Sequence, residues 1–510
     1  MRLRVAPIPE IIGPDGKGNY ASQRRFTELI RGIGHAINTI GDNVLGWADV
    51  RDYPSINAAV ASINSTSKTL VVSNTQPLAA NLTIPANIAL VVLKGGLITK
   101  ASTYTLAVNG AFEAGLYQAF SGFSAGDVTF GAGVAKEVYP EWWGIDGVAD
   151  EIEINSSAAS ISSGIIRLQS KTYTIAGSIK LYSYQELQGS GQETIISANL
   201  TASLVQELNK DNGQFIKVRN LKIDNTSKLN AGSVGIDFTG VGNSIIEDVW
   251  VNNVETAIRM AYATTGYYNT ITVPHIRNVI NGIVSVSGNS SNIFGGSIGT
   301  CDTGISIASS QVGVYGTAIE IFADYGINLN ASGICTLVNP RLENALAVGT
   351  GIYLGATASS NNIVSPYFGS MATYIDDQSG NTSNQYQGDE SYYGWKTYSP
   401  TVTSGAGAIT AYTATGRYLR AGKRVFLQLK ITITTKGTAA GAMIITLPTT
   451  ARDTVYYTII PFMELVTSLT TGAGNITPNS TTLQMVKYDF TTPFVANGDV
   501  WHGSGWYETE

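Results

Sequence analysis

The chain has 510 residues, which is too long for one ordinary core and predicts several domains of roughly 100–200 residues each. Its formal net charge is −6 and only 13% of its residues are charged, about half the usual ~25%. Its composition, with few charges and 55 glycines, is typical of extended β structure with many turns. The absence of a basic patch, of an apolar run of ~18 residues and of more than two cysteines argues against nucleic-acid binding, membrane insertion and a disulfide framework.

Neither a leader segment nor a metal site is expected. Residues 1–7 contain two arginines but no apolar core, so we expect no secretory signal and synthesis in a cytoplasm. His35, His275 and His502 lie far apart and show no metal-ligand spacing. The sequence therefore predicts no metal and no cofactor.

Residues 1–47 form a distinct first segment. After a stretch rich in proline and glycine, apolar residues recur at steps of three and four, which predicts a helix with one apolar stripe. The stripe consists of Phe26, Ile30, Ile33, Ile37, Ile40 and Val44. Such a helix either packs on its own domain or meets its symmetry mates in a trimer.

Residues 48–140 predict a small β-rich domain. Residues 53–63 have the pattern of one short amphipathic helix, with Ile56, Val60 and Ile63 on one side. Short apolar runs follow, and Gly, Asn or Pro separates them. They predict strands of about three to six residues with tight corners between them.

Residues 141–390 contain an internal repeat. A small residue followed by isoleucine and an alternating apolar residue recurs at intervals of 22, 25, 22, 22 and 25 residues. The repeats begin at Gly235, Ala257, Gly282, Gly304, Gly326 and Gly351, and a looser series ends at Ile245, Ile271, Ile293 and Ile363. Periods of this length indicate stacked units, and a parallel β-helix with one coil per repeat fits them best. The small residues suit tight corners, where φ is expected to be positive.

Residues 391–510 predict a different architecture. Residues 380–384 are interpreted as a linker, and the repeat stops after Phe368. From Val425 to Ile433 apolar and polar residues alternate strictly, which is typical of an antiparallel sheet with one wet face. We expect a β-sandwich.

Two stretches resemble a known family. Residues 139–150 (YPEWWGIDGVAD) resemble the opening motif of pectate-lyase-like β-helix proteins of bacteriophage tails, and residues 164–168, 173–175 and 187–191 continue the resemblance. Residues 416–425 and 437–441 are similar to a β-sandwich module that ends many phage tail proteins. Together these resemblances cover most of residues 48–510.

The resemblance implies an all-β protein with a right-handed parallel β-helix, a short helical N-terminal segment and a C-terminal antiparallel β-sandwich. It also implies a homotrimeric tailspike or tail fibre on the virion, made in the host cytoplasm, that binds a bacterial surface polysaccharide. Residues 1–47 are then expected to attach to a tail or baseplate protein. Apolar positions that one chain leaves uncovered, such as Val286, Ile321 and Leu354, agree with packing of three subunits.

A first candidate pair of catalytic carboxylates is Asp302 and Asp324. They lie 22 residues apart, each two residues before a repeat glycine, so stacking predicts a separation of ~4.8 Å. Repulsion at that distance should raise the pKa of one of them, as an acid and base pair in glycoside hydrolysis requires. Alternatively, both lie at solvated corners, where water weakens the repulsion.

A second candidate pair is Glu320 and Glu343. Each follows an inward apolar residue, so both should point outward from the same face, with Arg341 close enough to keep Glu343 ionised. Residues 339–344 resemble a recurrent tailspike motif. The alternative is a row of charges that only keeps the sheet surface soluble.

Aromatic residues supply candidate sugar contacts. Tyrosine offers a rigid apolar body with a polar tip, and Tyr315 and Tyr325 lie close in sequence to the candidate carboxylates. They could instead cover seams between subunits. Trp142 and Trp143 are interpreted as structural, and Cys301 and Cys335 as inward-pointing small hydrophobes.

Three functions remain open from the sequence. The first is a receptor-binding tailspike that grips polysaccharide without cutting it. The second is a depolymerase, an endo-glycosidase acting on capsule or lipopolysaccharide. Within it, hydrolysis is favoured over elimination because lysine is scarce between residues 230 and 390. The third is a purely structural tail component.

Overall fold

The computed structural model describes residues 46–100, 102–261, 266–381, 383–388, 395–421, 423–452, 458–467, 469–487 and 495–509. The helical stripe expected between residues 26 and 44 lies outside them. The chain forms two compact units, residues 1–167 and residues 168–510. Each is described by itself.

The first unit is built from short parallel strands on three sheets, in the orders β1-β2-β5-β8, β10-β7-β4 and β3-β6-β9. The strands of these sheets are β1 Trp47–Asp49, β2 Lys68–Val72, β3 Thr75–Leu78, β4 Leu82–Ile84, β5 Ile88–Val92, β6 Leu97–Lys100, β7 Leu106–Val108, β8 Phe112–Ala114, β9 Phe120–Ser121 and β10 Val128–Phe130. Outside the three sheets, β11 Glu137–Val138 pairs with β12 Gly164–Arg167. Leu70 lies opposite Leu90, and Leu82 opposite Leu106. This part of the chain is therefore itself a short three-faced parallel solenoid.

Helices cover parts of the first unit. They are η1 Val50–Asp52, α2 Ile56–Ile63, η2 Pro140–Trp143 and α3 Glu151–Ala159. The expected helix in residues 53–63 is present as α2, and Ser55 caps its first turn. Trp142 and Trp143 are buried, and the ring of Trp142 lies 4.9 Å from that of Phe112. Their interpretation as structural residues is confirmed.

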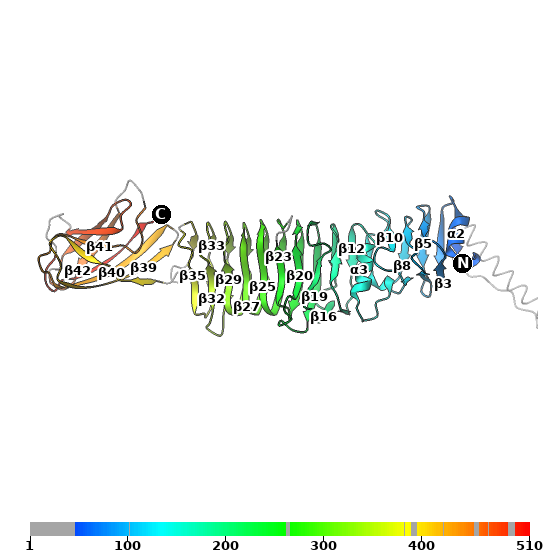
Figure 1. Ribbon diagram of the computed structural model, residues 1–510, viewed down its shortest axis with the longest axis horizontal. Coiled ribbons are helices and arrows are strands. Elements are labelled where there is room, and N and C mark those ends of the chain that lie inside the picture. Colours follow the sequence, from blue (N-terminus) through cyan, green and yellow to red (C-terminus); the bar gives the residue numbers. More distant parts are fainter. Residues whose placement is uncertain are drawn as a thin grey trace, which may run out of the picture. The chain divides into compact units, whose positions relative to one another are not determined.

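Unit 2 begins with a long parallel β-solenoid, seen in Figure 1 as a stack of coils from β16 to β35. Its strands are β13 Thr172–Ile175, β14 Ile179–Leu181, β15 Gln185–Gln188, β16 Ile195–Ala198, β17 Ser203–Glu207, β18 Gly213–Gln214, β19 Lys217–Asn225, β20 Val234–Thr239, β21 Val241–Gly242, β22 Ile245–Asn252, β23 Thr256–Ala261, β24 Thr270–Thr272, β25 His275–Asn289, β26 Asn292–Phe294, β27 Ser297–Ser310, β28 Gly313–Tyr315, β29 Ala318–Leu329, β30 Thr336–Val338, β31 Arg341–Glu343, β32 Thr350–Leu354, β33 Asn362–Val364, β34 Tyr367–Phe368, β35 Thr373–Asp377 and β36 Gln385–Gln387. The predicted parallel β-helix is confirmed.

The repeat isoleucines stack as predicted. Ile236, Ile258, Ile283, Ile305, Ile327, Ile352 and Ile375 are successive register partners. All but the last are fully buried, so one column of isoleucines fills one side of the core. In the second series Ile271 pairs with Ile246 and not with Ile245, because Ile245 points outward opposite Thr270.

Three faces can be followed along the coils. The first face comprises residues 245–247 of β22 together with β24, β26, β28, β30, β33 and β36. The second face comprises residues 249–252, 275–277, 297–299 and 318–320 with β31 and β34. The third face comprises β20, β23, the C-terminal parts of β25, β27 and β29, and β32 and β35.

The repeat glycines are small for a reason other than the expected one. None of them has a positive φ. A Cβ on Gly282 would lie 2.3 Å from the carbonyl oxygen of Gly304, and one on Gly304 would lie 2.5 Å from Ile319. The expectation of positive φ was wrong here, because close packing between coils excludes a side chain at this column.

Positive φ occurs at other corners. At one corner Tyr184, Phe215 and Tyr268 have φ of 66°, 56° and 59°. The backbone N–H of each of these three residues donates to a carbonyl oxygen of the next coil, as from Tyr184 to Gln214 and from Tyr268 to Asn289. The rings of Tyr184 and Phe215 stack with centroids 5.3 Å apart, so this corner displays exposed aromatics.

Residues 380–384 are not a linker. The described residues 380, 381, 383 and 384 lie between β35 and β36, and β36 pairs in register with β33. Asn384 is buried, and its Oδ1 accepts the backbone N–H of Asn361, whose own Oδ1 accepts that of Cys335. This buried ladder continues the solenoid one coil beyond the apparent end of the repeat.

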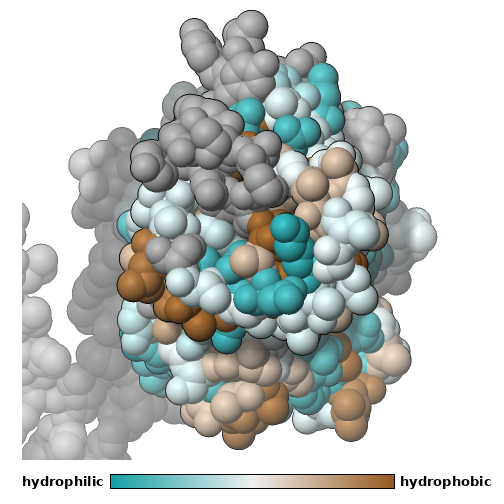
Figure 2. Space-filling view, turned by 90° about the vertical axis from the view of Figure 1, so that its left-hand side faces the viewer, coloured by the Kyte–Doolittle hydropathy of each residue, from teal (hydrophilic) through white to brown (hydrophobic). Residues whose placement is uncertain are grey.

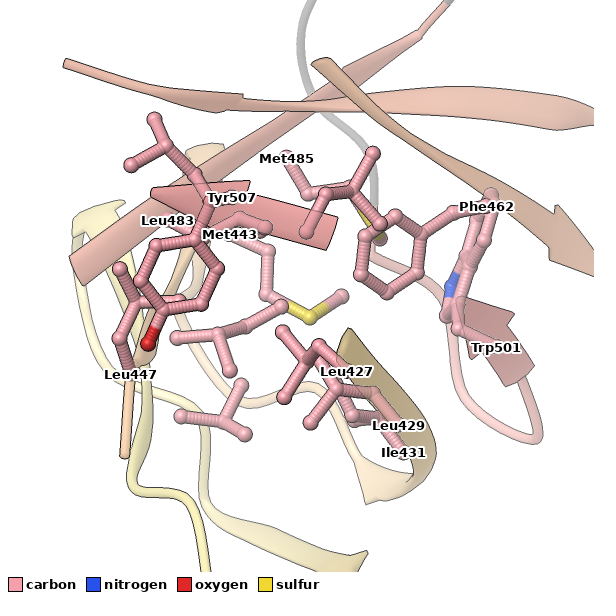
Figure 3. Packing of buried hydrophobic residues seen from close by; sticks show 14 of the residues in the cluster. Leu427, Leu429, Ile431, Met443, Leu447, Phe462, Leu483, Met485, Trp501 and Tyr507 are labelled. Carbon is pink, nitrogen blue, oxygen red and sulfur yellow. The ribbon is translucent and has the colours of Figure 1, made fainter. Parts of the chain in front are cut away.

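The C-terminal part of unit 2 is one antiparallel sheet, in the order β37-β39-β40-β45-β42-β43-β44-β41-β38. Its strands are β37 Lys396–Tyr398, β38 Val402–Ala406, β39 Ala411–Ala421, β40 Arg424–Thr435, β41 Ala440–Thr446, β42 Thr458–Glu464, β43 Thr471–Ile476, β44 Thr482–Lys487 and β45 Val500–Glu508. The sheet curls over a core that includes Leu427, Ile431, Met443 and Trp501 (Figure 3). The predicted alternation in β40 is confirmed, since Lys430 is exposed between buried Leu429 and Ile431.

Among the described residues, no helix has the length and apolar character needed to cross a membrane.

Candidate functional site

The structure distributes the predicted site residues over several surfaces. Glu320, Arg341 and Glu343 lie on the second face, Tyr315 on the first and Tyr325 on the third, while Asp302 and Asp324 lie between the second and third faces. The second face therefore brings together the largest group.

Glu320 and Glu343 are direct register partners on neighbouring coils. They line one hollow of about 390 Å³ together with Ile321, Asn344 and Gly369. Gly299 and Gly369 occupy the positions before and after the two glutamates in the same outward column. Neither flanking position has a side chain of its own, although the guanidinium of Arg277 lies over Gly299.

Arg341 connects the second glutamate to an aromatic ring. Its Nε and Nη2 atoms donate to Oε1 of Glu343 at 3.0 and 2.8 Å, and its guanidinium lies 6.0 Å from the centroid of the Tyr367 ring. Hydrogen bonding to Glu343 raises the pKa of Arg341 above its usual value. The expected pairing of Arg341 with Glu343 is present.

Sequence reasoning missed a second aromatic pair on this face. Trp250 and His275 are register partners, and their rings stack 4.4 Å apart at an interplanar angle of 17°. They belong to the same outward column as Arg341 and Tyr367. The spacing of 25 residues, which equals one coil, could have identified this pair.

Between the Trp250–His275 pair and the Arg341–Tyr367 pair the column contains only Ser297 and Ala318. The second face therefore has rings at two ends and small side chains between them. Five coil steps separate Trp250 from Tyr367, which corresponds to roughly 24 Å along the solenoid. We name the column from Trp250 to Tyr367, with the adjacent Glu320 and Glu343, the second-face row.

Asp302 and Asp324 do not form a simple stacked pair. The register shifts between Cys301 and Thr303, so Asp302 lies opposite both Ala323 and Asp324. Oδ1 of Asp302 also lies 3.4 Å from Nζ of Lys228, a residue that sequence reasoning did not connect with it. The bulge displaces one carboxylate from the column, and a lysine from a distant part of the chain supplies a counter-charge.

The two candidate tyrosines each stack on another ring. Tyr315 lies 4.9 Å from Phe294 at an angle of 14°, and Tyr325 lies 4.9 Å from Tyr353. Because they are on the first and third faces, neither shares a face with the glutamate pair. They are separate aromatic patches.

Asp237 is the most buried carboxylate of the third face, with a side chain 1% exposed. Burial opposes its ionisation, but hydrogen bonds from Lys210, Thr239 and Ser203 outweigh burial and hold the pKa of Asp237 below its usual value. Its oxygens are engaged within the chain. We assign it a structural role.

The buried thiols are unsuited to nucleophilic chemistry. Cys301 and Cys335 are buried, as expected, and desolvation raises the pKa of Cys301 to about 12. Within the described part of the chain, no group of three or more His, Cys, Asp or Glu residues could hold a metal ion. The second-face row can recognise a polar ligand, and its two carboxylates can do acid–base work.

No family model and no curated protein matches the chain. Similar solved structures include ORF18 of Geobacillus virus E2, with 14% identity over 71% of this chain and 79% of that one, at a TM-score of 0.40. The Dettilon tailspike protein is 12% identical over 92% and 95% of the two chains, with a TM-score of 0.39. The enzymatically active domain of tailspike protein 2 from bacteriophage CBA120 is 13% identical over 72% and 73%, with a TM-score of 0.37. Since these TM-scores are below 0.5, the likenesses carry no argument about what this chain binds.

Proposed function

We propose that this chain is a phage tailspike or tail fibre that recognises a bacterial surface polysaccharide through the second-face row. The observation that carries the proposal is the row itself, with the stacked rings of Trp250 and His275 at one end, the ring of Tyr367 beside Arg341 at the other, small side chains between them and carboxylates beside them. Sugar rings stack their C–H faces on aromatic side chains, and their hydroxyls need polar partners. An extended polysaccharide lying along the solenoid would contact both the aromatic rings and the polar side chains of the row.

The phage context rests on sequence. Residues 139–150 resemble the opening motif of β-helix proteins in phage tails, and residues 416–425 resemble a module that ends many such proteins. Solved structures of similar fold include phage tailspike proteins, but the proposal takes no support from them. Residues 1–47 would then attach the protein to a tail or baseplate component.

We propose further that the protein is a homotrimer. Val286 and Ile321 are 40% and 42% exposed, so one chain leaves both partly uncovered. Leu354, which was expected to be uncovered as well, is fully buried within its own chain, so that expectation was wrong. Packing of three solenoids would cover exposed apolar positions of this kind.

A second candidate function is cleavage of the same polysaccharide. The glutamate pair favours it, because retaining glycosidases use two carboxylates at close range, one as acid and one as nucleophile. Arg341 would neutralise the charge of Glu343 and leave Glu320 to donate the proton.

The test is to incubate the purified full chain with capsule and lipopolysaccharide preparations from a panel of bacteria, measuring binding and released reducing ends separately. Binding without product supports the first function, and binding with product supports the second. In the second case Glu320→Gln should lower the rate by about 10²–10⁴ while binding survives. Failure to bind any preparation would contradict both.

A further inference from the structure

The outer face of the C-terminal sheet, opposite its buried core, forms an ordered grid of side chains. In one row Phe426 lies beside Trp506, in the next Gln428 lies beside Ser504, and in the third Lys430 lies beside His502. Met463 of β42 extends the third row. The neighbouring strand β39 places Arg417 beside Gln428.

Two hollows lie on this face. One, of about 590 Å³, is lined by residues that include Pro461, Ser504 and Trp506. The other, of about 300 Å³, is lined by Arg417, Lys430 and others. Since Gln428 and Ser504 are register partners, the two hollows adjoin along the same strands.

Two tryptophans each have an arginine guanidinium over the ring, and one of them, Trp506, lines the larger hollow. Arg424 lies 5.3 Å from the ring centroid of Trp506, and Arg417 lies 4.8 Å from that of Trp395. Trp506 is 47% exposed, so a large apolar ring faces water although its residue lies within strand β45 of the sheet. Exposed tryptophan beside polar groups is a common element of sites for ring-shaped polar ligands.

The charge of the face is strongly biased. Its described outward side chains include Arg417, Arg424, Lys430 and Arg452, against the single carboxylate of Glu508. This bias opposes the net charge of −6 of the whole chain. Arginine binds carboxylates through two parallel hydrogen bonds, so the face is complementary to an acidic ligand.

From these observations we infer that the outer face of the C-terminal sheet is a second glycan-binding site, specific for acidic polysaccharides such as uronate polymers. The tryptophan rings would stack on sugars, and the arginines and Lys430 would bind their carboxylates. Figure 2, which faces the left-hand side of Figure 1, shows hydrophobic and hydrophilic side chains side by side at that end of the C-terminal sheet. The site is separate from the second-face row, and either could exist without the other.

The test uses the full chain and four immobilised polymers: polygalacturonate and hyaluronate as acidic probes, with dextran and pullulan as neutral ones. We expect binding to at least one acidic polymer, weakening steeply as salt is raised, and at least tenfold weaker binding to both neutral polymers. Trp506→Ala and Lys430→Gln should each lower the affinity at least fivefold. Tyr184→Ala and Lys217→Gln, which remove an exposed ring and an exposed cation from the solenoid, should not.

Three results would overturn the inference. One is that neither acidic polymer binds, and another is that Trp506→Ala and Lys430→Gln both bind as the unmodified chain does. The third is that these variants change the molar mass measured by light scattering, which would make the face a contact between copies of the chain.

Discussion

Glu320 and Glu343 lie directly opposite each other on neighbouring coils, yet their surroundings differ, because Arg341 donates two hydrogen bonds to Glu343. Two like charges at this spacing repel unless one is neutralised or protonated. The guanidinium therefore separates the roles that the two carboxylates can take. We expect Glu343→Gln to loosen Arg341 from its position over Tyr367 and to weaken glycan binding, whereas Glu320→Gln should affect cleavage more than binding. Titration of both variants with a polysaccharide that the protein binds checks this difference, and equal losses of binding would contradict it.

Asp237→Asn should weaken the third face locally. The substitution removes a buried charge that Lys210 and two hydroxyls hydrogen-bond, and such losses cost on the order of 1–3 kcal/mol. The measurement is hydrogen exchange of backbone amides in β17 and β20, which should become faster. Asp376→Asn is the matched control, because Asp376 belongs to the same outward column but lies in a more exposed position. Equal exchange in the two variants would contradict the role given to Asp237.

Asp237 also predicts a pH dependence. Its pKa is lower in the folded chain than in the unfolded chain, so its stabilising contribution is present above the unfolded value of ~3.9 and disappears as the pH falls through the folded value. The advantage of the unmodified chain over Asp237→Asn in the exchange experiment should therefore be full near pH 7 and shrink below about pH 4. An advantage that grew on acidification would have the wrong sign.

Gly282→Ala should destabilise the solenoid. Although Ala257 fills this column one coil earlier, a Cβ on Gly282 would lie 2.3 Å from the carbonyl oxygen of Gly304, which cannot move aside easily. Overpacking of this kind costs about 1–3 kcal/mol, so the melting temperature should fall. Gly333→Ala is the control, since its Cβ would meet nothing closer than 3.7 Å. Equal melting temperatures for the two variants would show that the coils adjust freely.

The sequence was sufficient to predict the coils but not their corners. The column from Ile236 to Ile352 follows directly from the repeat, because each coil must bury one isoleucine at the same height. The left-handed backbone of Tyr184 and Phe215 could not be predicted, since aromatic residues rarely adopt positive φ and the reason lies in hydrogen bonds to the next coil. The turn at Asn384 was misread as a linker for a similar reason, because its burial depends on the ladder to Asn361.

The candidate site was predicted in part. The sequence grouped Glu320, Glu343 and Arg341 correctly. They lie in short strands of one face, where the alternation along a strand decides which side chains point outward. Tyr315 and Tyr325 were grouped with them by sequence distance, although a corner separates each from that face. The bulge at Asp302 carries no sequence signal, and it moves Asp324 out of the column.

Cys301 and Cys335 should react slowly in the folded chain. Both are buried, and desolvation raises the pKa of Cys301 to about 12, so little thiolate is present near pH 8. Mixing with an aromatic disulfide reagent should release chromophore only after denaturant is added. Rapid release from the native chain would place a thiol at the surface.

The proposed trimer predicts the effect of a charge at an exposed apolar position. The unmodified chain should have three times the mass of one subunit by light scattering at micromolar concentration. Val286→Lys or Ile321→Lys should lower that mass if the position is buried between subunits, because a lone ammonium is costly to desolvate. Leu229→Lys, at a position also exposed but outside the three faces, should not. A stable monomer of the unmodified chain would rule the trimer out.

The central claim is that a polysaccharide lies along the second face between Trp250 and Tyr367, and the most direct measurement removes one ring at each end. Trp250→Ala and Tyr367→Ala should each weaken binding of a recognised bacterial polysaccharide by about tenfold to a hundredfold, as loss of an aromatic anchor does. Short oligosaccharides that reach only one end should respond to only one of the two variants. Tyr184→Ala, which removes an exposed ring at a corner away from this face, should bind normally. If both second-face variants bind as tightly as the unmodified chain, the polysaccharide does not lie on this face.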